Sequence, residues 1–194
     1  MNCIFEDNIN SAFLNYGIYE NTELLEKCIN DIDCQLEERP ELIIFGKKCK
    51  QQRFVGFFSN DSIGYKYSNK LMESKSIPES LLKIMDDVNE IIGSEYNGVL
   101  INKYMNGNDY IGAHSDNETG LDPRCGVICI SFGAERNFRI RNKNDKKICF
   151  ELATQNNSII QMSGNFQKIY THEIPIQKKI KEPRFSLTFR KHLY

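Results

Sequence analysis

The sequence predicts an α+β protein: a double-stranded β-helix, or jelly roll, buttressed on one side by N-terminal helices. Two observations predict this class. Apolar residues recur at helical spacing in two stretches, both within the first 93 residues, and about eight short strand-like segments separated by turn signals follow Gly93. A few helices followed by many short strands are typical of two packed sheets with helices on one side.

The first expected helix covers Asn21–Glu38. Either Asn21 or Thr22 can cap its start, and Pro40 ends the pattern. Its apolar residues recur at spacings of three and four: Leu24, Leu25, Cys28, Ile29 and Ile32. We therefore expect residues 1–40 to form a helical extension that packs as one unit with residues 41–194.

The second expected helix follows Pro78, with Ser76 as a candidate cap, and ends near Gly93. Its apolar stripe comprises Leu81, Leu82, Met85, Val88, Ile91 and Ile92. Before this helix, the aromatic segment 54–67 contains an S-N-D-S cluster, which predicts a turn between two extended pieces. Tyr65 and Tyr67 alternate around one lysine and would share a face.

Composition limits where the protein acts. No apolar run approaches the roughly 20 residues that span a bilayer, and the N-terminus does not resemble a signal peptide, so we expect no membrane association. The seven cysteines are scattered and never spaced C-x-x-C, which predicts neither a disulfide framework nor a cysteine zinc site. We expect a monomer in a reducing intracellular compartment, the nucleus or the cytoplasm.

The two halves of the chain differ in charge although the net charge is only −1. Residues 1–100 carry 10 basic and 17 acidic side chains, and residues 101–194 carry 15 and 9. A positive half suits an anionic ligand or a nucleic-acid backbone. Uneven solvated surface would explain the same difference, so charge alone does not decide between them.

Two of the three histidines belong to a candidate metal site. His114 and Asp116 are two residues apart, so on a strand both side chains would leave the same face. His172 lies in a later strand, which a closed barrel can bring close to them. Two histidines and one carboxylate bind Fe(II) and leave positions open for a substrate and dioxygen.

The last predicted strand, R-F-S-L-T-F-R, carries a candidate anion site. Arg184 and Arg190 are six residues apart, so they share a face with Ser186 and Thr188. Two guanidinium groups inside a barrel are costly to bury without an anion. Arginine binds carboxylates in a bidentate manner, and a dicarboxylate with a keto-acid group would satisfy both this strand and an iron site.

Residues 44–192 resemble the AlkB family of Fe(II)- and 2-oxoglutarate-dependent nucleic-acid dealkylating dioxygenases. The matching pieces are N-K-Y, D-Y-I-G-A-H-S-D-N-E, S-F-G-A, T-H-E-I-P and P-R-F-S-L-T-F-R-K. The resemblance is closest to the branch that repairs alkylated double-stranded DNA. It implies a lid for nucleotide recognition and a jelly-roll dioxygenase domain within residues 41–194, with oxidative demethylation of bases such as N1-methyladenine and N3-methylcytosine.

The resemblance also implies roles for residues at matching positions. Fe(II) would be held by His114, Asp116 and His172, and dioxygen would be the oxidant. Arg190 is expected to clamp the distal carboxylate of 2-oxoglutarate. Ser186 stands where the family usually carries asparagine, so its contact is open. The full set expected to hold 2-oxoglutarate is Asn102, Tyr104, Arg184, Ser186, Thr188 and Arg190.

For the substrate, the resemblance implies that an alkylated base flips out of the helix. Tyr65 and Tyr67 would stack on this base, with His114 on its other side. Glu118 would read its exocyclic edge, and Phe45 would fill the gap left in the duplex. Phosphate contacts are expected among basic residues of two groups: Lys47, Lys48, Lys50, Arg53, and Arg136, Arg139, Arg141, Lys146, Lys147, Lys168, Lys178, Lys179, Lys181.

Three readings of the function remain open at this point. DNA is favoured over RNA as the nucleic acid only by the closeness to the duplex-repairing branch and by Phe45. The same chemistry could act on RNA or on a protein side chain, as elsewhere in the 2-oxoglutarate dioxygenase superfamily. A binding module that has lost catalysis is disfavoured because the metal and arginine residues are intact.

Overall fold

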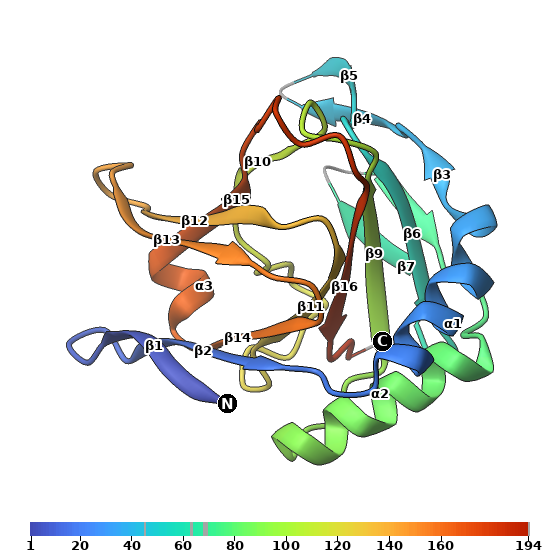
Figure 1. The fold of residues 1–194 in the computed structure, drawn as a ribbon. Helices are drawn as coiled ribbons and strands as arrows, with labels where there is room; N and C mark the ends of the chain where they lie inside the picture. The colour runs from blue at the N-terminus through green and yellow to red at the C-terminus, as the bar shows by residue number, and fades with distance from the viewer. Residues whose placement is uncertain (45, 63, 68–69, 194) are drawn as a thin grey trace.

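Two facing antiparallel sheets form the body of the protein (Figure 1). The computed structural model describes residues 1–44, 46–62, 64–67 and 70–193, with the side chains of 44, 65–67, 70 and 71 left out. The large sheet has the order β1 (Asn2–Asp7), β2 (Ala12–Ile18), β14 (Ser158–Gly164), β11 (Val127–Gly133), β16 (Arg184–Arg190), β9 (Gly98–Tyr104), β6 (Phe54–Ser59), β3 (Glu37–Glu38). The small sheet has the order β10 (Ile111–His114), β15 (Tyr170–Ile174), β12 (Arg136–Asn142), β13 (Ile148–Thr154).

Two hairpins stand apart from these sheets. They are β4 (Glu41–Ile44) with β5 (Lys47–Lys50), and β7 (Gly64–Tyr67) with β8 (Lys70–Glu73), each a two-stranded sheet of its own. The turn of the first hairpin includes Gly46, whose φ of 75° is a conformation that glycine adopts without strain. The predicted jelly roll with few helices is therefore confirmed.

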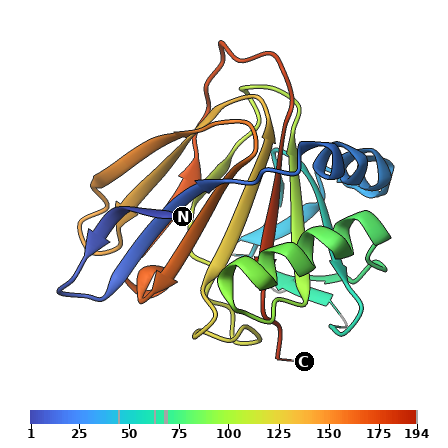
Figure 2. The ribbon, with the colours of Figure 1, turned by 60° about the horizontal axis from the view of Figure 1, so that its bottom comes forward.

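The helices α1 (Thr22–Ile32) and α2 (Glu79–Ile92) cover one face of the large sheet (Figures 1 and 2). Asn21 caps α1 by accepting a hydrogen bond from the backbone of Leu24, and Gly93 ends α2 in the left-handed conformation. Their buried residues share a core with the sheet: Leu25, Cys28, Ile32, Leu81, Ile84 and Val88 pack with Val99, Ile101, Ile128, Ile130, Leu187 and Phe189.

Along three central strands, successive side chains point alternately into this core and into the space between the two sheets. On β16, Phe185, Leu187 and Phe189 belong to the core beneath the helices, while the polar residues between them face the other way into a cavity. The strands β9 and β11 alternate in the same manner. The polar residues on the cavity face of these strands are therefore buried between the sheets.

The expected helical extension over residues 1–40 is wrong in its first part. Residues 2–7 and 12–18 form β1 and β2, and β2 pairs with β14 from Ser158 to Gly164. The helix ends at Ile32, earlier than expected, and is followed by a 3-10 turn, η1 (Asp33–Gln35), and then β3. Ala12 and Leu14 are buried on one face of β2, but the strand needs β14 as a partner, 140 or more residues away in sequence.

A short helix, α3 (Phe166–Ile169), connects β14 to β15. Its Phe166 is fully buried in the second core, with Phe138, Ile140 and Tyr170. Within the described residues no helix is long and apolar enough to cross a membrane.

The residues after β16 close the loop that follows β10. The backbone of Asp122 donates to Lys191 and that of Leu193 donates to Gly120, while Leu121 and His192 form an antiparallel bridge. Asn97 holds the same segment through two hydrogen bonds with the backbone of His192, of 2.7 and 3.0 Å. The end of the chain is thereby tied to the segment that carries part of the candidate metal site.

His192 gives a testable pH dependence of stability. Burial and, to a smaller extent, the positive charge of Arg190 together lower the pKa of its imidazole to about 4. An unfolded histidine titrates near pH 6.5, so between about pH 6.5 and about pH 4 the unfolded chain binds a proton that the folded chain does not. The free energy of unfolding therefore falls as pH falls through this window, by up to ~1.4 kcal/mol per pH unit from this residue.

Urea denaturation at several pH values checks this expectation. His192→Asn should reduce the slope of unfolding free energy against pH by about the amount that one proton contributes. Equal slopes in the wild type and the variant would contradict the assignment. Because the comparison is between slopes, a constant loss of stability in the variant does not affect it.

Candidate active site

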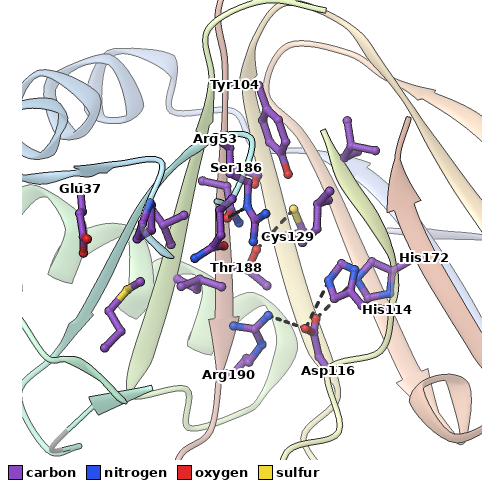
Figure 3. Close-up of a pocket in the computed structure, with 18 of the residues that line it drawn as sticks. Glu37, Arg53, Tyr104, His114, Asp116, Cys129, His172, Ser186, Thr188 and Arg190 are labelled. Carbon is purple, nitrogen blue, oxygen red and sulfur yellow. Dashed lines mark hydrogen bonds and ion pairs between the residues drawn. The ribbon is translucent and has the colours of Figure 1, made fainter. Parts of the chain in front are cut away.

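A cavity of about 370 Å³ lies between the two sheets (Figure 3). Its walls come from β9, β11 and β16 of the large sheet and from β10, β12 and β15 of the small sheet. The hairpins add Leu42, Met72 and Glu73 at the wall. The cavity brings together residues that are far apart in sequence and that the sequence analysis had connected only by spacing.

His114, Asp116 and His172 converge on one point in this cavity. Their ligand atoms all lie within 4.8 Å of one another. His114 ends β10 and pairs directly with His172 on β15, with ring centroids 4.3 Å apart. The Nε2 atoms of the two histidines lie 3.8 and 3.6 Å from the carboxylate oxygens of Asp116.

Asp116 lies just past the end of β10, so the loop and not the strand places it. Gln167 of α3 accepts a hydrogen bond of 2.9 Å from the backbone N–H of Asp116. Ser115 donates to the backbone of Tyr170 at 2.7 Å. Gln167 could not be predicted from the sequence, because a glutamine in a four-residue helix gives no signal of its contact.

The protonation states of the three residues suit a divalent metal. Burial lowers the pKa of His114 and lowers that of His172 to about 3, so both imidazoles are neutral at physiological pH. Nδ1 of His114 lies 2.9 Å from the carbonyl oxygen of Gly112 and donates to it. The lone pair of Nε2 is therefore free to bind a metal. Burial alone would raise the pKa of Asp116, but Arg190 and the two histidines outweigh it and hold this pKa at about 2. Two neutral imidazoles and one carboxylate are the ligands of non-heme Fe(II).

Arg184 forms a buried anion site in the wall opposite the small sheet. It is 1% exposed, and its Nη2 donates to Oγ of Ser131 at 2.8 Å. Its Nε and Nη1 have no hydrogen-bond partner among the described residues. The ring of Tyr104 lies 5.4 Å from the guanidinium carbon. A buried guanidinium with open donors fits a carboxylate group of a ligand.

Arg190 lies at the metal end of the cavity. Its Nη2 donates to Oδ1 of Asp116 at 2.6 Å, in an ion pair that is almost completely buried. Arg184 is six residues away along β16, toward the other end of the cavity. By strand geometry the Cα atoms of the two arginines are roughly 20 Å apart. This placement argues against the expected contact of Arg190 with the distal carboxylate of a co-substrate, and it favours Arg184 for that contact.

The other residues expected to hold the co-substrate line the same wall. Asn102 of β9 pairs in register with Ser186 of β16, and Tyr104 pairs with Arg184. Thr188 donates to Sγ of Cys129 at 3.9 Å, a long contact. Asn102, Ser186 and Thr188 are all buried. The structure therefore gathers all six residues into one cavity.

Two residues of this wall were not expected there. Arg53 is buried and donates from Nε to Oδ1 of Asn102 at 2.6 Å, although it was expected to contact phosphate. Cys129 lies on β11 opposite Thr188. The sequence around Arg53 does not distinguish it from the exposed lysines before it. Its side chain is buried because it directly precedes a buried strand.

The residues expected to contact the base are less completely placed. Phe45 lies outside the described residues. Tyr65 and Tyr67 belong to β7, whose backbone is described but whose side chains at these positions are not. Glu118 is partly buried and does not line the cavity.

The expected phosphate contact of Arg136 is wrong. Arg136 is 1% exposed and donates to the backbone of Asn106, Asp109 and Pro175, which holds two loops together. Arg139 pairs with Glu151 and Glu173, and Arg141 pairs with Glu173. Arg139 and Arg141 thus pair with acidic side chains of the protein itself, and their contact with phosphate stays a prediction. The expected lysines are exposed: Lys47, Lys48, Lys50, Lys146, Lys147, Lys168, Lys178, Lys179 and Lys181.

Comparison with known proteins agrees with this site. A family model described as the 2OG-Fe(II) oxygenase superfamily matches residues 18–190, and such enzymes use Fe(II), 2-oxoglutarate and dioxygen. The chain is 31% identical over 185 residues to "DNA oxidative demethylase ALKBH2" of Mus musculus, covering 92% of this chain and 77% of the mouse protein. It is 29% identical to the protein of the same name from Homo sapiens, with 92% and 71% covered.

The chain belongs to the AlkB family within the 2OG-Fe(II) oxygenase superfamily. A solved structure described as "The structure of OsALKBH1" has the same fold, with a TM-score of 0.64 and 17% identity over 92% of this chain and 97% of that chain. The resemblance seen in the sequence is confirmed. The protein is a dioxygenase whose cofactor is Fe(II) and whose co-substrate is 2-oxoglutarate.

Proposed function

We propose that the protein removes alkyl groups oxidatively from N-alkylated bases in DNA, such as N1-methyladenine and N3-methylcytosine. One observation carries this proposal: a neutral His–His pair and an ionised Asp116 share a buried cavity with the open donors of Arg184. This combination suits a metal and a dicarboxylate together. DNA as the substrate is supported by the two relatives named "DNA oxidative demethylase ALKBH2".

In this proposal His114, Asp116 and His172 hold Fe(II), and Arg190 holds Asp116 in place from the far side. Arg184 and Tyr104 bind the distal carboxylate of 2-oxoglutarate, while Asn102, Ser186 and Thr188 line the space between the two ends. Bound iron would supply the hydroxylation of the N-alkyl carbon, with dioxygen as the oxidant and 2-oxoglutarate oxidised alongside to succinate and carbon dioxide, after which the alkyl group leaves as an aldehyde. The protein itself positions the base and excludes water.

The base is proposed to enter between the hairpin β7–β8 and the small sheet. His114 at the end of β10 would flank it, and the aromatic residues Tyr65 and Tyr67 would stack on it. Phe45, which in the sequence directly follows β4, is proposed to fill the gap in a duplex. Exposed lysines of β5 and of the loop before β16 would contact phosphates, as positively charged residues commonly do.

We further propose that the protein acts as a monomer in a reducing compartment that contains DNA. The reducing compartment is supported by the seven free cysteines, of which four are exposed: Cys3, Cys34, Cys49 and Cys149. Exposed thiols persist in a reducing environment and oxidise elsewhere. Size-exclusion chromatography with light scattering would test the oligomeric state.

One assay with matched substrates tests the proposed function. The protein is incubated with Fe(II), 2-oxoglutarate and oligonucleotides of one sequence carrying N1-methyladenine or N3-methylcytosine, as duplex DNA, single-stranded DNA and RNA. Mass spectrometry measures loss of the methyl group, which we expect to be fastest on DNA. Faster turnover of RNA would identify RNA and not DNA as the substrate. No turnover of any oligonucleotide would refute the proposal.

The same assay includes Phe45→Ala. If Phe45 fills the gap left by a flipped base, this variant loses about tenfold in kcat/KM on the duplex and much less on the single strand, where no gap forms. Equal losses on both substrates would remove this role from Phe45.

A further inference from the structure

Arg53 lies in the cavity wall, immediately before β6, and none of the roles proposed above uses it (Figure 3). Its Nε donates to Oδ1 of Asn102 at 2.6 Å, and the two residues are only 6% and 5% exposed. Within the described part of the chain, this is the one hydrogen bond of the Arg53 side chain. The buried guanidinium group of Arg53 therefore donates to a residue that is expected to hold the co-substrate.

This contact decides which way the Asn102 amide faces. A guanidinium group has donors and no acceptor, so only the oxygen of the amide can be turned toward Arg53. The Nδ2 group of Asn102 must then face away from Arg53. The reversed amide would place N–H donors against N–H donors in a buried site, which is unfavourable.

The direction of the amide matters because the ligand of this wall is an anion. Asn102 is the register partner of Ser186, and both lie between Arg184 at one end of β16 and Arg190 at the other. With Nδ2 toward the cavity, Asn102 offers N–H donors to a carboxylate. With Oδ1 toward the cavity, it would offer a lone pair and repel the carboxylate.

We propose that Arg53 is a positioning residue for 2-oxoglutarate, which fixes the Asn102 amide so that its N–H groups face the co-substrate. The proposal rests on the proposed role of Asn102 as a ligand of 2-oxoglutarate. Arg53 acts through Asn102, and the direct contact with the co-substrate belongs to Asn102.

Binding of 2-oxoglutarate to the Fe(II)-loaded protein, without oxygen and without nucleic acid, tests the proposal. Calorimetry, or the visible absorption that Fe(II) gains when a 2-oxo acid chelates it, gives the dissociation constant. Arg53→Met, which has no donor, should raise this constant about tenfold. Arg53→Gln keeps a side-chain N–H for Oδ1 of Asn102 and should raise it less than about threefold. Equal effects of the two variants would overturn the proposal.

A double-mutant cycle separates an effect through Asn102 from an independent one. Asn102→Ala should weaken 2-oxoglutarate binding by a similar factor, and adding Arg53→Met to it should change the constant less than about twofold. If Arg53→Met weakens binding equally in both backgrounds, Arg53 does not act through Asn102. Arg39→Met is the control, because Arg39 pairs with Gln52 and Asp109 outside the cavity and should leave the constant unchanged.

If Arg53→Met does not fold, 2-oxoglutarate binding to Asn102→Asp tests the proposal instead. Its carboxylate still accepts the hydrogen bond from Arg53 but presents no donor to 2-oxoglutarate, so binding should weaken at least as much as in Asn102→Ala. Wild-type affinity in Asn102→Asp would overturn the proposal.

The proposal and the proposed substrate fail in different ways. If no oligonucleotide is demethylated but 2-oxoglutarate binds as predicted in the Arg53 variants, the substrate is wrong and the role of Arg53 stands. If Arg53→Met raises KM for an oligonucleotide and leaves 2-oxoglutarate binding unchanged, Arg53 contacts nucleic acid and its positioning role is refuted.

Discussion

Replacing Asp116 with asparagine is expected to lower kcat/KM at least about a thousandfold, a loss of roughly 4 kcal/mol in transition-state stabilisation. Asp116 carries the only negative charge of the His–Asp–His site, and its pKa of about 2 keeps it ionised throughout the physiological range. The amide of Asn keeps an oxygen for Arg190 but removes the charge that attracts a divalent cation. Iron content after equilibrium dialysis should fall together with turnover.

The fold should survive this change. Asp116 lies outside the strands, and Gln167 still holds its backbone N–H in the variant. Asp122→Asn is the matched control, since this carboxylate belongs to the same loop, has a pKa also held at about 2 by Arg124, and does not line the cavity. The control should keep turnover within about threefold, about 0.7 kcal/mol. Normal iron binding and substantial turnover in Asp116→Asn would contradict the metal site.

Replacing Arg184 with methionine is expected to raise the dissociation constant of 2-oxoglutarate about a hundredfold, near the ~1.5–3 kcal/mol that hydrogen bonds to charged groups contribute. Arg184→Lys keeps the charge but cannot bind a carboxylate in a bidentate manner, so the dissociation constant should rise about tenfold. Arg139→Met is the control, because Arg139 pairs with Glu151 and Glu173 outside the cavity and should not change the affinity.

A 2-oxo acid without a distal carboxylate, 2-oxobutanoate, tests which arginine lies at which end. The wild type should bind it much more weakly than 2-oxoglutarate. In Arg184→Met this preference should disappear, whereas in Arg190→Met it should persist while iron binding weakens through the loss of the partner of Asp116. If the preference disappears in Arg190→Met instead, Arg190 holds the distal carboxylate after all.

Much of the fold could be predicted because its signals are local. The apolar stripes of α1 and α2 and their caps at Asn21 and Gly93 lie within single segments of the chain. The strands after Gly93 alternate cleanly, as on β16, and each is bounded by turn residues. β1 and β2 could not be predicted because their place in the sheet depends on a distant partner: β2 pairs with β14, and β1 pairs with β2.

The candidate site divides in the same way. The metal residues could be predicted because histidines are few and His114 and Asp116 are close in sequence. The order of Arg184 and Arg190 along the cavity could not be predicted, because it depends on how the large sheet lies against β10 and β15. The contact between Arg53 and Asn102 spans 49 residues and joins a loop end to a strand, so no periodicity indicates it.

The separation of the hairpins from the sheets has a consequence for how this protein can change over evolution. The residues proposed to hold iron and co-substrate lie mainly on β9, β16 and β15, each with hydrogen-bonded neighbours on both sides. Among the residues that the structure describes, the strands of the hairpins β4–β5 and β7–β8 pair only within each hairpin. Mutations in them can therefore accumulate and adapt the entrance to a new target molecule, while the reaction inside is inherited unchanged.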